Sequence, residues 1–244
     1  MSAGDGRIER IATYLKQAEA LIFDVDGTLA ETEEVHRMAF NEAFALGGLG
    51  WNWNQAAYKW LLQTTGGKER IRAFEKMREP GCDELSQTEV DNLHRIKTRV
   101  YGEIIARGGC PLRPGVMATI RLAQSRGQRL AIATTTSSEN IGALLTGSLG
   151  AEWQDVFEVV VAGDDVPYKK PAPDVYLEVL RRLQLPAAAC VAIEDSVNGL
   201  RSAILAGIPT IITKSQYFQD ENFGGALGVI ETLDDLYDET DDSS

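Results

Sequence analysis

Residues 20–30, with the sequence ALIFDVDGTLA, decide the fold of this chain. A short apolar run there ends in two aspartates, Asp24 and Asp26, with a single residue between them. A short apolar run that stops at polar residues is typical of a buried strand. The sequence therefore predicts a strand at residues 20–25 whose end holds two like charges close together. Such a pair repels, so its presence points to a function.

Later parts of the chain repeat this strand pattern and alternate it with helical patterns. Short apolar strands that alternate with helices imply a parallel sheet with both faces covered, so we predict a doubly wound α/β fold. The further strands are expected at 129–134, 158–162, 189–193 and 209–213, with a weak last one near 229–230. The helices between them are expected at 116–126, 138–149, 172–183 and 196–206.

The first two predicted strands are separated by about a hundred residues, whereas a crossover needs only about a dozen. The excess carries helix-like patterns, divided by the Gly- and Pro-containing stretches GGLG and EPGCD. We therefore predict a small helical domain inserted into the α/β domain. The expected boundaries are 1–33 and 109–232 for the core domain, 34–108 for the helical domain and 233–244 for an acidic tail.

Composition excludes some classes of protein. The net charge is −12, which disfavours binding to nucleic acid because phosphate backbones require Lys and Arg. No apolar run approaches the roughly 20 residues of a membrane span, and the first residues lack the apolar stretch of a secretory signal. Three widely spaced cysteines without a CxxC pattern fit a reducing compartment. We expect a cytoplasmic, monomeric protein without membrane or nucleic-acid partners.

Polar side chains follow several of the predicted strands, where an open α/β sheet places its binding site. Four carboxylates in one place repel unless a hard divalent cation joins them, and oxygen ligands favour Mg²⁺. The sequence therefore predicts a magnesium site next to a lysine and a cluster of hydroxyl groups. The residues concerned are Asp24, Asp26, Thr134, Thr135, Thr136, Lys170, Glu194 and Asp195.

This set of groups suits phosphoryl transfer. A carboxylate such as Asp24 can attack phosphorus and form an aspartyl phosphate. Lys170 and Thr134 are placed to hold the remaining phosphoryl oxygens. Asp26, two residues after Asp24, is the candidate to protonate the leaving oxygen and then to activate water.

Four segments, FDVDGTL, ATTTS, KKPAPDVY and EDSVNGL, resemble in order and spacing the motifs of the haloacid-dehalogenase superfamily of phosphatases. The resemblance implies that Asp24 is the nucleophile and Asp26 the general acid and base. It implies Mg²⁺ bound by Asp24, by the backbone carbonyl of Asp26 and by Asp195, with Glu194 close by. It also implies that Thr134 and Lys170 bind the phosphoryl group.

The helical insert resembles the cap domain of the subgroup that contains β-phosphoglucomutase, phosphoglycolate phosphatase and the CbbY-type sugar phosphatases. The segments AETEEVHRMAFNEAF, TTGGKERI and ATTTS together resemble the CbbY type, which removes the 1-phosphate of xylulose 1,5-bisphosphate, an inhibitor of Rubisco. A bisphosphate needs a second cationic site, which the cap would supply. The candidate substrate-binding residues of the cap and its entry are Glu33, His36, Gly66, Gly67, Lys68, Arg70, His94, Arg95 and Lys97.

Other interpretations remain open. The same chemistry fits a phosphoglycolate phosphatase or a phosphomutase of the β-phosphoglucomutase kind, and a catalytically silent protein that binds a phosphorylated metabolite is a third possibility. Gly66 and Gly67 alone indicate no more than a turn, and Lys169 lacks a role in the motifs. The tryptophans Trp51, Trp53 and Trp60 are expected in the core of the cap.

Overall fold

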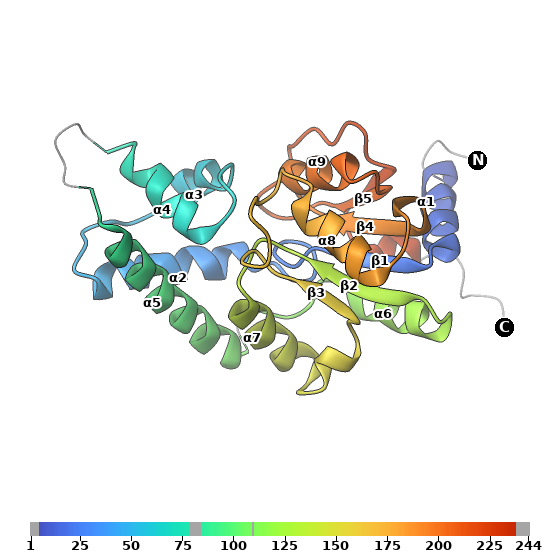
Figure 1. Cartoon of the computed structure of the whole chain (residues 1–244), viewed down its shortest axis with the longest axis horizontal. Helices are drawn as coiled ribbons and strands as arrows, with labels where there is room; N and C mark the ends of the chain where they lie inside the picture. The colour runs from blue at the N-terminus through green and yellow to red at the C-terminus, as the bar shows by residue number, and fades with distance from the viewer. Residues whose placement is uncertain (1–4, 79–83, 109, 238–244) are drawn as a thin grey trace.

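A six-stranded parallel sheet forms the centre of the protein, which is a computed structural model that describes residues 5–78, 84–108 and 110–237 (Figure 1). The strand order is β3-β2-β1-β4-β5-β6, so the first strand of the chain lies in the middle. This arrangement confirms the predicted α/β class. The strands are β1 (Ala20–Phe23), β2 (Arg129–Ala133), β3 (Val159–Val161), β4 (Cys190–Glu194), β5 (Thr210–Thr213) and β6 (Gly228–Ile230).

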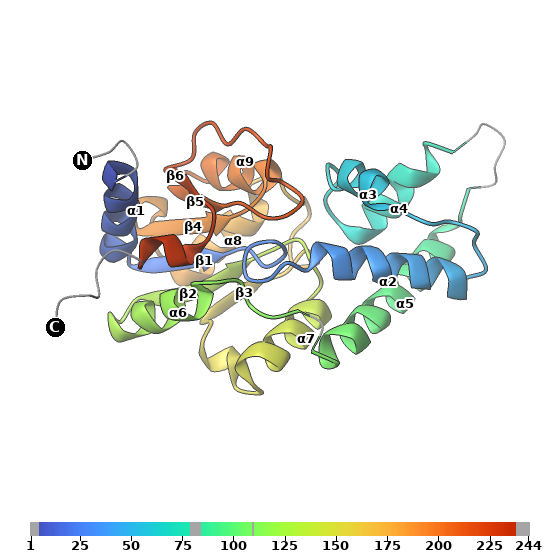
Figure 2. The same ribbon diagram turned by 180° about the vertical axis from the view of Figure 1, so that it is seen from behind.

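Helices cover both faces of the sheet, as Figures 1 and 2 show from opposite sides. Successive side chains of β1 point to opposite faces, so Leu21 and Phe23 join one apolar cluster while Ala20 and Ile22 join the other. The first cluster includes residues of α1, α6 and α7, and the second includes residues of α8 and α9. These helices are α1 (Asp5–Gln17), α6 (Val116–Ser125), α7 (Ser138–Leu149), α8 (Asp174–Leu183) and α9 (Val197–Leu205).

Four more helices form the second lobe, at the left of Figure 1, which we call the cap. They are α2 (Glu33–Leu46), α3 (Gln55–Leu61), α4 (Gly67–Glu75) and α5 (Gln87–Ala106). An aromatic cluster that includes Phe40, Phe44 and Trp53 holds them together, and Trp51 packs against it. Trp60 was wrongly expected in this core, because it is 46% exposed. The inner face of the short helix α3 is occupied by Tyr58 and Leu61, three residues apart.

The two lobes are joined at a double linker and along α5. The outgoing and returning chains meet at an antiparallel bridge between Ala30 and Leu112. The end of α5 packs near α7, and its residues Tyr101 and Ile105 belong to the apolar cluster of the core domain. The cap therefore has its own aromatic core and shares a second one with the sheet domain. We propose 34–108 as its boundaries.

The predicted acidic tail starts within the packed structure. Leu233 is buried, and a short 3-10 helix, η3 (Leu233–Leu236), packs near α1 and α6. The remainder of the predicted tail, residues 238–244, lies outside the described part of the chain. Two other 3-10 turns, η1 (Trp153–Asp155) and η2 (Ala187–Ala189), connect helices to strands.

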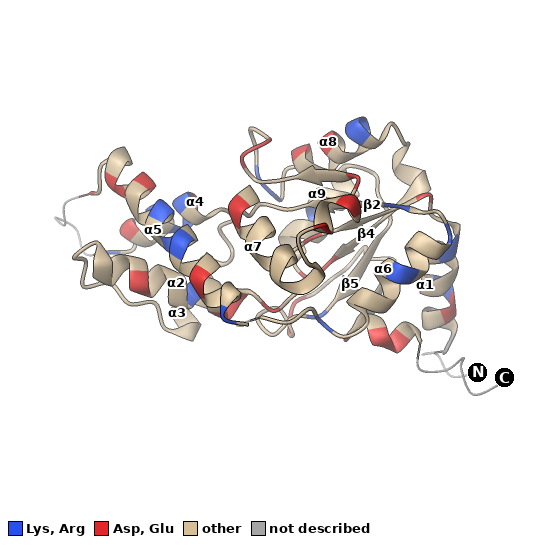
Figure 3. Ribbon diagram, turned by 90° about the horizontal axis from the view of Figure 1, so that it is seen from below, with Lys and Arg blue, Asp and Glu red and all other residues tan. Residues whose placement is uncertain are grey.

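Charged residues of both signs are interspersed over the two lobes in the view of Figure 3. Among the described helices, none is long and apolar enough to cross a membrane.

Candidate active site

The carboxyl ends of β1, β2 and β4 meet under the cap and bring together groups that are far apart in the sequence. Lys170 is at the centre of this cluster. Its Nζ lies 2.6 Å from Asp24 Oδ1, 2.6 Å from Glu194 Oε1 and 2.9 Å from the carbonyl oxygen of Ala133. All three charged side chains are buried. The parallel strands thus place the predicted nucleophile and the predicted phosphate-binding lysine in direct contact.

Buried negative charge exceeds buried positive charge at this point. Burial, together with the neighbouring carboxylates, raises the pKa of Asp24 to about 8 although Lys170 opposes the shift. Burial, together with the carboxylates of Asp24 and Glu194, raises the pKa of Asp195 well above its usual range, and a hydrogen bond from Ser215 opposes this. Burial lowers the pKa of Lys170, but the two facing carboxylates outweigh it and the net shift is upward.

The donor set fits a hard cation. Oxygen atoms of Asp24, Glu194 and Asp195 lie within 4.8 Å of one another. Glu194 is the least available of the three, because its Oε1 accepts hydrogen bonds from both Lys170 and Tyr176. Asp195 has no basic partner among the described residues. A divalent cation here would balance the excess carboxylate charge.

The hydroxyl-rich segment after β2 forms one wall of the cavity. Thr134, Thr135 and Thr136 line it, as predicted, and Ser137 caps the start of α7. Asn140 was not identified from the sequence. Its amide nitrogen donates to Thr136 Oγ1 at 3.0 Å, and its buried Oδ1 has no hydrogen-bond partner in the described part of the chain. The start of α7 therefore presents hydroxyl and amide groups to the cavity, which is suitable for a phosphate group.

Asp26 is held by a partly buried chain of hydrogen bonds that reaches into the cap. Its Oδ1 lies 2.9 Å from His36 Nε2 and 2.5 Å from Thr32 Oγ1. The other ring nitrogen of His36, Nδ1, lies 2.7 Å from Lys97 Nζ. A neutral His36 that carries its proton on Nε2 satisfies both contacts, with Lys97 as the donor at Nδ1.

Charges along this chain favour an ionised Asp26. Burial alone would raise its pKa, but His36, Thr32 and Lys97 together hold it well below the usual range. Burial lowers the pKa of Lys97 to about 7, although Asp26 opposes this. Burial also lowers the pKa of His36, and Lys97 adds to the effect. Asp26 is therefore held in its ionised form, and the cap residue Lys97 contributes to that state.

The cap side of the cavity contains a second set of linked polar groups. Tyr58 donates from its hydroxyl to Glu33 Oε2 at 2.8 Å, and Arg70 NH1 donates to the same hydroxyl at 2.8 Å. Glu33 and Arg70 are both buried and both line the cavity. Tyr58 had not been identified from the sequence, where it looks like any aromatic residue of a helical core.

Not every predicted cap residue supplies a cation to the cavity. His94 lines it, but burial and the nearby lysines lower its pKa to about 3, so it is neutral at pH 7. Lys68 lines the cavity and pairs with Asp91 at 2.8 Å. Arg95 does not line it. Arg95 instead lies on the groove between α5 and α7 and donates to Asn92 Oδ1 at 2.6 Å.

Gly66 and Gly67 allow the start of α4 to approach its neighbours closely. Gly66 has a φ of 92°, which favours glycine, and a Cβ there would lie 2.9 Å from Lys169 Cδ. A Cβ on Gly67 would lie 2.7 Å from His94 Nε2. The small residue at Gly66 therefore permits close contact between cap and core, and the one at Gly67 permits close packing of α4 against α5 within the cap.

Several contacts between cap and core close the mouth of the cavity. Lys169 Nζ lies 3.0 Å from Glu69 Oε1, and Asn198 Nδ2 donates to the carbonyl oxygen of Gln63 at 3.2 Å. The hydroxyl of Thr65 donates to the carbonyl oxygen of Lys170. Lys169, which has no role in the sequence motifs, is thus part of the closed interface.

Loss of the pair between Lys169 and Glu69 is expected to weaken closure modestly. An ion pair as exposed as this one contributes about 1 kcal/mol or less, so Lys169→Met should raise KM by no more than about fivefold. High salt should produce the same change in the wild type and little further change in the variant. Steady-state kinetics at low and high salt measure this. Arg181→Met, which breaks an exposed pair on α8, is the control and should leave KM unchanged. An increase in KM well above fivefold for Lys169→Met, or an increase that does not depend on salt, would contradict the prediction.

Comparison with known proteins agrees with the geometry. The family model described as haloacid dehalogenase-like hydrolase matches residues 18–207. The protein CbbY of Rhodobacter capsulatus is 52% identical over 210 residues, which cover 86% of this chain and 91% of that protein. The crystal structure of CbbY from Rhodobacter sphaeroides with phosphate is 45% identical, with a TM-score of 0.85, and covers 90% of this chain and 96% of that one.

A second crystal structure of the Rhodobacter sphaeroides protein, a mutant in complex with xylulose 1,5-bisphosphate, has a TM-score of 0.84 and 44% identity, and covers 88% of this chain and 95% of that one. The chain belongs to the haloacid dehalogenase-like hydrolases. Within them it is a phosphatase of the CbbY type.

Proposed function

We propose that this phosphatase depends on Mg²⁺ and removes the 1-phosphate of xylulose 1,5-bisphosphate through an aspartyl phosphate on Asp24. Its similarity to a CbbY protein crystallised with that bisphosphate supports the choice of substrate. Within the structure, the observation that carries the proposal is a buried arginine on the cap side of the cavity, opposite the groups that would hold the reacting phosphate.

That arginine is Arg70. It donates to Tyr58 and more weakly, at 3.4 Å, to the carbonyl oxygen of Thr64. Among the described residues, no carboxylate forms an ion pair with it. A buried guanidinium without an anionic partner is costly unless an anion arrives, and its planar geometry matches a phosphate group. Arg70 and Lys170 line the same cavity, so the cavity can bind one phosphate at each end.

The first chemical step is assigned to Asp24. One of its carboxylate oxygens attacks phosphorus, an aspartyl phosphate forms, and the bond between phosphorus and the sugar oxygen breaks. Lys170 and Thr134 hold the phosphoryl oxygens, and Asp26 gives a proton to the leaving sugar oxygen. Asp24, Asp195 and the carbonyl of Asp26 would hold Mg²⁺. When bound, the ion supplies positive charge that lets an anionic nucleophile approach an anionic phosphate.

The second step regenerates the enzyme. Asp26, now ionised, accepts a proton from water while the water oxygen attacks phosphorus and the bond to Asp24 breaks. The proton that Asp26 receives is available for the leaving group of the next turnover. The contacts with His36, Thr32 and Lys97 favour the ionised form that this step requires.

A panel of substrates tests the proposal. Phosphate release with Mg²⁺ is measured for xylulose 1,5-bisphosphate, ribulose 1,5-bisphosphate, fructose 1,6-bisphosphate, 2-phosphoglycolate and β-glucose 1-phosphate. The expected result is a clear preference in kcat/KM for the xylulose compound. Preference for 2-phosphoglycolate would reject the bisphosphate assignment. Conversion of glucose 1-phosphate to its 6-phosphate without net release would indicate a phosphomutase instead.

Replacement of Arg70 is expected to remove the preference of the enzyme, in kcat/KM, for a bisphosphate over a monophosphate. A charged hydrogen bond to a buried group is worth about 1.5–3 kcal/mol, so Arg70→Gln should lower kcat/KM for the bisphosphate about 10- to 100-fold. The value for a sugar monophosphate should change much less. Steady-state kinetics on both substrates give the ratio. Lys68→Met is the matched control with a smaller expected loss, because Lys68 is partly exposed and already paired. Equal losses on both substrates would show that Arg70 acts only on cap structure.

Binding of Mg²⁺ to the metal-free protein is expected to release protons. The raised pKa of Asp24, about 8, means that its carboxyl group holds a proton at pH 7, which the ion must displace. About one proton or more per ion should appear in solution at pH 7, and the share from Asp24 should disappear as the pH rises above 8. The apparent affinity should therefore increase up to about pH 8. Calorimetric titrations in two buffers of different ionisation enthalpy measure the release, and identical heats in both buffers would contradict it.

A further inference from the structure

The segment that follows β5 contacts Asp195, a candidate ligand of the proposed cation. Ser215 is buried, and its Oγ donates to Asp195 Oδ2 at 2.6 Å. Gly27, in the turn after Asp26, packs against the same two residues. A Cβ on Gly27 would lie 1.9 Å from Asp195 Oδ2 and 3.2 Å from Ser215 Cβ. Asp195, Ser215 and the turn after Asp26 therefore form one compact group.

One buried arginine holds this group together. Arg113 lies in the linker that returns from the cap, and its backbone N–H donates to the carbonyl oxygen of Leu29 at 2.8 Å. Its guanidinium donates to the carbonyl oxygen of Gly27 and to that of Lys214 at 2.5 Å. The same group also donates at 3.0 Å to the carbonyl oxygen of Glu231. A single side chain thus fixes the turn after Asp26, the end of β5 and the end of β6.

The other end of the segment belongs to the cap. Tyr217, two residues after Ser215, is part of the aromatic cluster of the cap. Its hydroxyl donates to Glu34 Oε2 at 2.7 Å, and its ring lies 5.7 Å from that of Tyr58. A stretch of three residues therefore links a candidate metal ligand to the packing of the cap.

We propose that Ser215 and Arg113 are positioning residues for the divalent cation. Ser215 occupies Oδ2 of Asp195 and so turns Oδ1 toward the cation site, and Arg113 fixes the turn whose Asp26 carbonyl is a second candidate ligand. Partners of this kind orient the ligands of a metal and govern its affinity. The inference rests on the cation of the proposed function.

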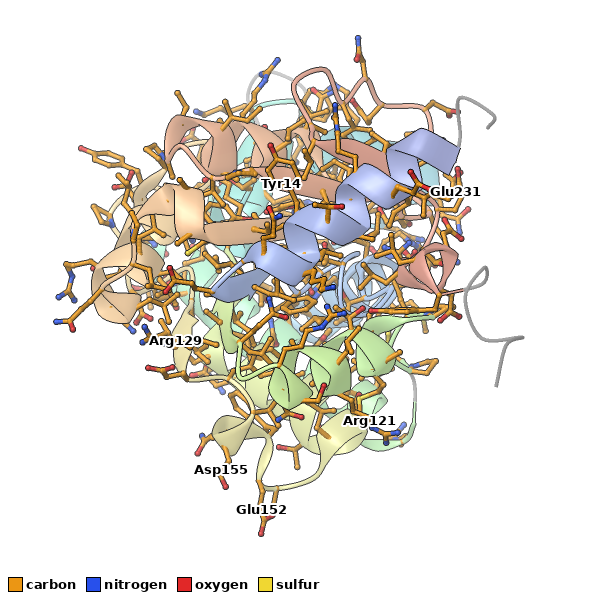
Figure 4. All side chains as sticks on the ribbon, turned by 90° about the vertical axis from the view of Figure 1, so that its right-hand side faces the viewer. Tyr14, Arg121, Arg129, Glu152, Asp155 and Glu231 are labelled. Carbon is orange, nitrogen blue, oxygen red and sulfur yellow. The ribbon has the colours of Figure 1, made fainter. Side chains whose placement is uncertain are left out.

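The competing explanation is that both residues only stabilise the fold. Arg129 provides a matched comparison, because it too is an arginine that donates to a main-chain carbonyl, that of Leu183, at 2.5 Å and pairs with Glu158. Figure 4 looks at the end of the molecule opposite the cap and shows Arg129 there, away from the proposed cation site. Arg129→Lys should therefore lower the stability of the fold without changing the affinity for the cation.

Calorimetric titration of the metal-free full-length protein with Mg²⁺, repeated with Mn²⁺, tests the proposal directly. Ser215→Ala and Arg113→Lys are each expected to weaken binding about 10- to 100-fold, while Arg129→Lys binds as the wild type does. Ser215→Thr, which keeps the hydroxyl, should restore most of the affinity. Thermal unfolding of each metal-free variant is measured separately, so that binding is compared only between folded proteins.

The outcomes separate this inference from the proposed function. If the wild type binds neither ion, the cation itself is rejected and the inference is rejected with it. If the wild type binds and Ser215→Ala binds equally well, only the positioning role is rejected. Should Arg113→Lys fail to fold, Ser215→Ala decides the question alone, because it removes a single oxygen atom.

Discussion

Asp24→Asn is expected to abolish phosphate release. The amide cannot attack phosphorus, and loss of a nucleophile removes most of the acceleration of enzymes that act through covalent intermediates, on the order of 10⁵-fold or more. The contact between Asp24 and Lys170 is a hydrogen bond that an amide oxygen can also accept, so the fold should survive. Phosphate release at saturating Mg²⁺ is the measurement.

The control for this variant is its binding of substrate. Asp24→Asn should still bind the bisphosphate, because Arg70, Thr134 and Lys170 remain in place, and its circular dichroism should match the wild type. Activity within about 100-fold of the wild type would contradict a covalent role for Asp24. A wild type without any turnover would instead support the silent binding protein that the sequence left open.

Asp26→Asn is expected to lower kcat for sugar phosphates by about 10²–10⁴-fold. The sugar oxygen is a poor leaving group and needs the proton of Asp26, and the water of the second step needs Asp26 as its base. An aryl phosphate with a leaving group that requires no proton isolates the second step. With p-nitrophenyl phosphate, the variant should release about one equivalent of nitrophenol quickly and then slow down, because the aspartyl phosphate accumulates.

Rapid-mixing kinetics with the aryl substrate test this expectation. Thr32→Val is the matched control, since it removes one of the hydrogen bonds to Asp26 but keeps the carboxylate. It should lower kcat by less than about tenfold. A variant Asp26→Asn that shows no burst and an unchanged steady rate would assign the acid–base role to another group.

The sheet and the polar residues at its edge could be predicted from the sequence because both depend on local patterns. An apolar run predicts a buried strand, and the carboxylates that follow it mark the end of the strand where a site is expected. Asp24 follows one such run, and Glu194 and Asp195 end another. The rule for parallel sheets then brings those ends together without any knowledge of the helices. The same rule places Lys170, which follows β3, at this edge of the sheet, and the loop between β3 and α8 then carries it to Asp24 and Glu194.

The residues that the sequence did not reveal act through long-range contacts between unlike elements. Tyr58 and Ser215 have no distinguishing pattern, and only the folded chain brings them to Glu33 and Asp195. Charge was also a poor guide within the cap. His94 is neutral because it is buried beside lysines. Arg95, the next residue of α5, lines the groove between α5 and α7 but not the cavity, whereas His94 lines both. Adjacent helical positions face different directions.

The central position of β1 has a consequence for the order in which the chain can fold. β1 is made first, yet its partners are residues 129–132 of β2 and 190–193 of β4. During synthesis both of its edges stay unpaired until those segments leave the ribosome, while the intervening cap helices can form from local contacts. Pairing across such separations is slow, and an unpaired apolar strand can associate with other chains. Assembly of this sheet is therefore a late event, and a chain that stops before β4 leaves one edge of β1, the strand that leads to Asp24, unpaired.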